Sequence, residues 1–134
     1  MEKKELQEKY IKAELLNKGL EQLTVQRNYI QINLEQISLL YASLDRLSEG
    51  DSYSQVGEDI YIKSKITSTD DFLVNVGKRI FVKMNKDELK KFLEEKKKKL
   101  ENALLVTDKK SNEMVNELQK ISAEIRDIDI QLNN

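Results

Sequence analysis

VGEDIYIK at residues 56–63 and VGKRIFVK at residues 76–83 are two copies of one short unit, V-G-x-x-I-aromatic-[I/V]-K. After each glycine turn, apolar and other side chains alternate, as in IYIKSKI and IFVKM. A period of two with β-branched and aromatic residues predicts strands. SYSQV and FLVNV predict shorter strands before the two glycines, and TSTDD predicts a polar turn between the copies. The sequence therefore predicts two β-hairpins within residues 52–84.

The residues before this doubled unit follow a heptad pattern. Thirteen positions from Leu6 to Ser48 are spaced alternately by three and four residues, and ten of them are apolar. Such a pattern predicts one long helix, over about residues 4–49, with a coiled-coil seam along one side. We expect Gly50 to close this helix in the left-handed conformation.

The residues after the doubled unit carry a second seam. The same steps, taken backward from Leu132 to Lys90, meet thirteen positions, of which nine are apolar. They predict a helix over about residues 86–132. Asn85, with Glu88 three residues later, is typical of a capping box at its start.

Two helices of similar length, joined by the hairpin segment, predict an antiparallel coiled coil. In the expected register the numbers of two facing residues sum to about 134. This register places Arg27 level with Thr107. We hypothesise that these polar seam positions fix the register, as polar seam residues do elsewhere. The alternative is that a two-helix coil tolerates exposed polar positions in its seam.

The composition excludes several classes of function. Charged residues make up 35% of the 134 residues, yet the net charge is only −1, which argues against a dedicated binder of nucleic acid or anionic membranes. Cysteine and histidine are both absent, so disulfides, thiol chemistry and the usual zinc ligands are excluded, and we expect no metal or cofactor. No signal peptide or membrane span is apparent, so we expect a single soluble, cytoplasmic domain over residues 1–134.

Two charged motifs have simpler explanations than a binding or catalytic site. Lys96–Lys99 form a run of four lysines flanked by acids, which is typical of a solvated helix face. Asp70 and Asp71 lie in the expected turn, with no nucleophile or base near them in the sequence. No glycine-rich phosphate loop is present. We therefore expect no catalytic residues and no enzyme activity.

Two hairpins on their own are marginal in water, and their edges stay open to pairing. We therefore expect strands from other subunits to close a sheet, which gives an oligomer with a β hub and coiled-coil arms. The fold class is accordingly α+β, a long antiparallel two-helix coiled coil connected by two β-hairpins. The hairpin residues expected to form the hub are Val56, Gly57, Ile60, Ile62, Ile66, Val76, Gly77, Ile80 and Val82.

Residues 53–85, YSQVGEDIYIKSKITSTDDFLVNVGKRIFVKMN, resemble the α-class subunits of prefoldin. The strand, glycine turn, strand, TD-containing turn and second V-G turn follow one another in that family's order. The resemblance implies a hexamer of two α and four β subunits whose hairpins form two β-barrels. It also implies that the coiled-coil tips hold non-native polypeptides without ATP and pass them to a group II chaperonin.

One departure widens the range of relatives. Many α-class members have proline in the first strand, whereas this chain has Ser54-Gln55-Val56-Gly57. The difference leaves room for a relative of the γ type, which resembles α subunits and forms filaments. A self-assembling structural filament or scaffold is therefore the alternative to a chaperone subunit. A third, weaker alternative is a tethering coiled coil that binds nucleic acid through the lysine run.

The resemblance places client contacts at the open ends of the helices. We define the tip surface as the apolar residues expected there, namely Leu6, Tyr10, Ile11, Leu15, Ile125, Ile128, Ile130 and Leu132. Ile11, Leu15 and Ile130 lie off the seam, so the paired helix does not obviously cover them. The alternative for these three residues is packing against the partner helix or against neighbouring subunits.

Overall fold

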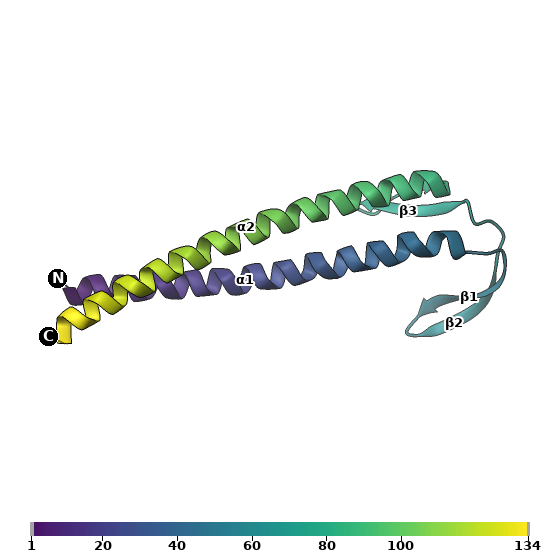
Figure 1. Ribbon diagram of the computed structural model, residues 1–134. Coiled ribbons are helices and arrows are strands. Elements are labelled where there is room, and N and C mark those ends of the chain that lie inside the picture. The colour runs from purple at the N-terminus through teal and green to yellow at the C-terminus, as the bar shows by residue number, and fades with distance from the viewer. Residues whose placement is uncertain (1, 134) are drawn as a thin grey trace. The chain divides into compact units, whose positions relative to one another are not determined.

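The computed structural model describes residues 2–133 and contains two long helices with two antiparallel β-hairpins between them in the chain (Figure 1). The α+β class and the order of elements are as predicted. The elements are α1 (Glu2–Ser43), a 3-10 turn (Leu44–Arg46), β1 (Gly50–Gly57), β2 (Ile60–Ile66), β3 (Phe72–Gly77), β4 (Ile80–Met84) and α2 (Lys86–Asn133).

The chain divides into two compact units. The helical unit pairs α1 up to residue 33 with α2 from residue 100 onward. The hairpin unit holds residues 34–99, that is, the end of α1, both hairpins and the beginning of α2.

In the helical unit the two helices run antiparallel, and the purple start of α1 lies beside the yellow end of α2 (Figure 1). Lys9 Nζ lies 2.6 Å from Glu124 Oε2, and Arg27 Nε lies 2.8 Å from Asp108 Oδ1. In both pairs the residue numbers sum to within one of 134, which confirms the predicted register in this unit. The predicted seam residue Thr107 is buried between the helices.

The end of α1, in the hairpin unit, differs from the prediction. The helix ends at Ser43 rather than near residue 49, and Gly50 does not close it. Gly50 is instead the first residue of β1, paired with Ile66. The physical reason is tertiary packing: Leu44 is only 1% exposed and sits in the 3-10 turn, after which Leu47 is already extended. Ser48 therefore lies outside the helix and is not part of a seam.

The seam also shifts at the beginning of α2. The heptad steps predicted Lys90 at a seam position, but the buried residue is its neighbour Leu89. Lys90 instead donates a hydrogen bond of 2.9 Å to Asp45, and its ammonium lies 5.6 Å from the centre of the Tyr41 ring. Tyr41 in turn donates its hydroxyl to Glu94 at 2.9 Å. Burial of Leu89 turns the lysine to the edge of the helix pair, where Asp45 is exposed and Tyr41 is half-buried.

The start of α2 is capped as predicted, with one addition. The Glu88 N–H donates to Asn85 Oδ1 at 2.8 Å, and the Asn85 N–H donates to Glu88 Oε1 at 3.3 Å, which together form a capping box. Asp70, from the turn between the hairpins, accepts a 2.7 Å hydrogen bond from the Lys86 N–H. A carboxylate at this place satisfies a helix N–H and complements the helix dipole. The turn therefore fastens the second hairpin to α2.

Replacing Asp70 by alanine should lower the free energy of unfolding by about 1 kcal/mol, because one N–H at the start of α2 loses its acceptor. Asp70→Asn keeps an acceptor and should cost less than Asp70→Ala. Urea unfolding followed by circular dichroism measures both values. Asp71→Ala serves as the matched control at the neighbouring position. Equal losses for Asp70→Ala and Asp71→Ala would refute the capping role.

The two hairpins repeat the same turn geometry. Glu58 and Asp59 have φ values of 46° and 60°, and Lys78 and Arg79 have values of 49° and 61°. Two successive residues with positive φ form a type I′ connection, which favours Asn-Gly rather than charged residues. Gly57 (φ 144°) and Gly77 (φ 126°) lie beside the two turns, where each register shifts by one residue. Each hairpin therefore holds two residues in a conformation that costs them energy.

Replacing Asp59 by glycine should stabilise the first hairpin by about 0.5 kcal/mol, since glycine adopts positive φ without the steric cost that Asp59 bears. Asp59→Val is the matched control and should destabilise the hairpin, because a β-branched residue fits this conformation poorly. Thermal unfolding monitored by circular dichroism ranks the three proteins. A glycine variant that melts below the parent chain would contradict the strain argument.

Candidate functional site

The most prominent surfaces of the described chain are exposed apolar side chains on the hairpins. In the first hairpin Ser54 faces Ile62 and Gln55 faces Tyr61, so Ile60, Ile62 and Ile66 share one face, as predicted. In the second hairpin Val74 faces Val82 on the corresponding face. Of the residues expected to form the hub, Ile66 is half-buried and the other eight are exposed: Val56, Gly57, Ile60, Ile62, Val76, Gly77, Ile80 and Val82.

The second hairpin uses part of its apolar face inside its own unit. Phe72, Val74 and Met84 are half-buried, and β3 lies beside the first turns of α2 (Figure 1). Phe72 and Val74 line an apolar groove together with residues from both helices of this unit. The helical lining residues are Leu40, Leu44, Leu89, Phe92 and Leu93, and the extended residue Leu47 also lines the groove. The turn end of the same face, with Val76 and Ile80, remains open to solvent.

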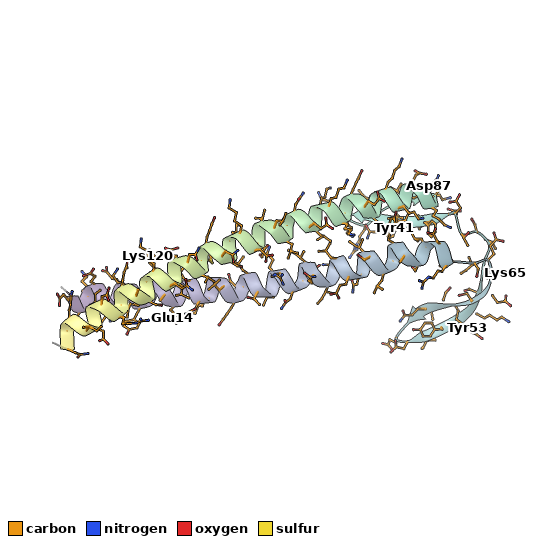
Figure 2. All side chains as sticks on the ribbon, in the orientation of Figure 1. Glu14, Tyr41, Tyr53, Lys65, Asp87 and Lys120 are labelled. Carbon is orange, nitrogen blue, oxygen red and sulfur yellow. The ribbon has the colours of Figure 1, made fainter. Side chains whose placement is uncertain are left out.

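The first hairpin exposes both of its faces. Val56, Ile60 and Ile62 are exposed on one face, and Tyr53 and Tyr61 on the other, where Figure 2 labels Tyr53. Within residues 2–133 each hairpin is a sheet of only two strands. A two-stranded sheet with both faces and its edges exposed is marginal in water. The arrangement is suited to pairing with strands of another chain.

The tip surface divides into two classes. Leu6, Ile125 and Ile128 lie on the seam and are half-buried between the helices. The exposed class comprises Tyr10, Ile11, Leu15, Ile130 and Leu132, of which all but Leu132 are more than half exposed. The helices cover these five side chains only in part, so in the isolated chain their exposed surface is available to a partner.

A shallow groove brings together only some of the tip residues. Tyr10 and Ile11 of α1 and Ile125 of α2 line it, together with Leu118, a seam residue that the sequence analysis did not assign to the tip. Its cavity volume is about 610 Å³. Leu15, Ile130 and Leu132 do not line this groove. The tip is thus one open groove with additional apolar side chains outside it rather than a closed pocket.

Ion pairs hold the helices together beside this groove. Lys9 donates to Glu124 at 2.6 Å, and Lys12 lies 3.2 Å from Glu117. The hydrogen bond from Lys9 lowers the pKa of Glu124 below its ordinary value of 4.5, and the same bond raises the pKa of Lys9 above 10.5. The pair therefore favours the charged form of both residues at neutral pH.

The helical unit should lose stability in acid. Because the pKa of Glu124 is lowered in the folded state, its contribution is present above pH 4.5 and is lost as the pH falls through the folded-state pKa. Lys9→Met should lower the thermal midpoint at pH 7 and less at pH 3, because the contribution of the pair declines as the pH falls toward the lowered pKa of Glu124. Lys110→Met, which replaces an exposed lysine of α2, is the control. A Lys9→Met effect of equal size at both pH values would contradict the assignment.

Several exposed apolar residues were missed by the sequence analysis. They are Val25, Tyr29, Ile32, Leu39 and Leu40 on α1, Leu73 and Phe81 on the second hairpin, and Leu105 and Val106 on α2. Val25, Tyr29, Ile32 and Leu39 follow the heptad spacing that identified the seam, but on another face of the helix, whereas Leu40 does not. A search for a second heptad register would have found these residues.

The charged side chains of the described residues do not gather into a candidate metal site. Among residues 2–133, no group of three acidic side chains is placed to hold a metal ion. The four lysines at residues 96–99 are exposed on α2. Neither described helix contains an apolar segment of the length that crossing a membrane requires. What the surface can do chemically is associate with other apolar surfaces.

Comparison with known proteins agrees with this geometry. Residues 16–131 match the family model for prefoldin, described as prefoldin subunit. A search of curated protein sequences found no match. Among solved structures, the chain is similar to a cryo-EM structure of filamentous PFD from Methanocaldococcus jannaschii, with a TM-score of 0.53 and 24% sequence identity. The similarity covers 88% of this chain and 95% of that chain, and it shows a shared fold.

Proposed function

Because this chain belongs to the prefoldin family, we propose that it is a subunit of an ATP-independent chaperone that captures non-native polypeptides at its tip surface. In this proposal the assembly contains two α-like chains and four β subunits, and their hairpins join into a β hub. Captured clients then pass to a group II chaperonin. Coiled-coil arms then keep the apolar tips of one assembly apart, so that these tips do not bury one another.

The observation that carries the proposal is the exposed part of the tip surface. Tyr10, Ile11, Leu15 and Ile130 are each more than half exposed at the end of the helical unit that holds the first turns of α1 and the last turns of α2. Burying one such side chain contributes about 1.5–3 kcal/mol, so a single tip binds weakly and without strict shape requirements. Once one tip has bound a client, the other tips of the same assembly are present at a high effective concentration. Several weak contacts together therefore hold one client firmly.

Light scattering of a thermally aggregating client, with and without the assembled protein, tests the client role. Tyr10→Ser, Ile130→Ser and Leu132→Ser together should abolish most of the protection and leave the mass of the assembly unchanged. The matched control is Leu105→Ser with Val106→Ser, which removes exposed apolar residues of α2 outside the tip surface. Full protection by the tip variant, or an equal loss in the control, would refute client binding at the tip.

A specific observation also favours a second candidate, a self-assembling filament. The similar solved structure is that of a filamentous prefoldin, and both hairpins of this chain expose apolar faces that copies of the same chain could cover. Mass under native conditions, alone and with a β-class subunit, separates the two candidates. Six chains in a 2:4 mixture support the hexamer, whereas long polydisperse polymers of this chain alone support the filament.

A further inference from the structure

In the helical unit, α1 carries apolar residues on two faces. One face is the seam against α2. The second, which we call the outer stripe, consists of Ile11, Leu15, Lys18, Gln22, Val25, Tyr29 and Ile32, spaced alternately by four and three residues. Its five apolar members are 54–69% exposed, so α2 does not cover them. A helix that is apolar on both sides is normally covered on both sides, whereas α2 is clearly amphipathic and α1 is not.

The outer stripe also has the composition of an interface. Residues 22–33 contain a single charged side chain, Arg27, which points toward α2 and is paired with Asp108. Apart from the Arg27 side chain, which is 46% exposed beside Asp108, the surface of this stretch is uncharged, in a chain of which 35% is charged. Depletion of charge together with an exposed tyrosine distinguishes the centre of protein interfaces from ordinary surface. The alternating spacing of three and four residues matches the surface of another helix.

The pattern of the stripe is complementary to itself when two copies run antiparallel. In the register where facing residue numbers sum to 40, Ile11 faces Tyr29, Leu15 faces Val25, and Lys18 faces Gln22. Four of the five apolar members thus meet an apolar residue, whereas Ile32, at the end of the stripe, faces Glu8. The lysine ammonium meets an amide oxygen that can accept its hydrogen bond. A parallel arrangement would instead place Lys18 against Lys18, which is repulsive.

We propose that the outer stripe of α1 is a docking surface for the outer stripe of a second copy of this chain, in antiparallel orientation. Antiparallel pairing directs the two α1 helices oppositely, so the contact joins subunits of separate assemblies rather than neighbours at one hub. A single stripe is a small interface, but an assembly presents several, and their combined binding is stronger than that of one. The inference goes beyond the proposed function and does not depend on client binding.

Because the chain has no cysteine, single cysteines give a direct test on the full protein. Leu15→Cys and Val25→Cys chains, carrying tags of different size, are assembled separately, mixed and oxidised. The proposed register brings these two positions together, whereas the two copies of residue 15 would lie about 15 Å apart along the helix. Since a disulfide spans less than about 7 Å between Cα atoms, the mixed disulfide should exceed either homodisulfide at least about tenfold.

The controls separate pairing from chance collision. Leu105→Cys, at an equally exposed leucine of α2, mixed with Val25→Cys should give no preferred mixed disulfide. Tyr29→Glu added to both cysteine chains should reduce the mixed product about tenfold, while circular dichroism and native mass confirm that the fold and the hub remain. Abundant homodisulfide from Leu15→Cys would show parallel pairing and overturn the proposal. A random mixture would also overturn it and would show that the stripe serves another partner, such as a client polypeptide.

Discussion

Replacing Ile62 and Val82 together by aspartate is expected to dissociate the assembly into single chains that keep their helices. Both side chains are exposed in the isolated chain and lie on the apolar faces of the two hairpins. If these faces form the hub, each substitution removes about 1.5–3 kcal/mol of apolar burial and adds a charge where water is excluded. A loss of about 3–6 kcal/mol per chain weakens association more than hundredfold.

Sedimentation velocity or native mass spectrometry measures this loss directly. Lys63→Asp with Lys83→Asp is the matched control, since it places the same charges one residue further along, on the opposite faces of the two hairpins. The control should keep the mass of the parent assembly. If the Ile62 and Val82 variant kept that mass as well, the hub would have to be built from other surfaces.

The hairpins were the part of the fold that the sequence predicted best. β2 and β4 begin and end at the predicted residues, and β1 and β3 differ from the prediction by at most two. Their signals are local, because the alternation of apolar residues and the glycine beside the turn lie within a few residues of each other. The capping box of Asn85 and Glu88 was predictable for the same reason.

The errors and omissions arose where distant residues decide the outcome. Gly50 was expected to end α1, but the helix ends at Ser43 and a 3-10 turn follows, in which Leu44 is buried. Heptad counting placed Leu44 on the seam, but it gave no signal for the change to 3-10 geometry. Asp70 was assigned only to a turn, because its partner at Lys86 lies sixteen residues further along the chain. Lys90 was placed on the seam by heptad counting, which takes no account of the packing that buries Leu89 instead.

The site residues stay a prediction, but the structure shows how far each of them is exposed. Alternation of apolar residues located the hairpin residues, and the family resemblance placed client contacts at the open ends of the helices. The structure then separated the half-buried seam members of the tip surface from the exposed ones. The outer stripe went unnoticed except for Ile11 and Leu15, because only one register was followed along α1. The net charge and the composition of the whole chain give no information about one face of a helix. The outer stripe is identified only when the exposed fraction of each side chain is known.

Leu44→Ala should cause the largest loss of stability of any single substitution considered in this chain. Leu44 is the most completely buried large side chain among residues 2–133, and it lines the apolar groove with Phe72 and Leu89 of the same unit. Truncating a buried leucine to alanine removes its burial and leaves a cavity, at a cost of about 2–5 kcal/mol. Because Leu44 also ends α1, the 3-10 turn should loosen and the hairpin unit should melt first.

Urea unfolding monitored by helical circular dichroism gives the overall loss, and hydrogen exchange shows where protection is lost. Leu39→Ala, which truncates an exposed leucine of α1 in the same unit, should change the stability of the dissociated chain by less than about 0.5 kcal/mol. Amides of β3 and of the first turns of α2 should exchange faster in Leu44→Ala, while those of the helical unit keep their rates. Similar stabilities for Leu44→Ala and Leu39→Ala would contradict the role of Leu44 in stabilising the hairpin unit. They would also mean that burial of Leu44 does not end α1.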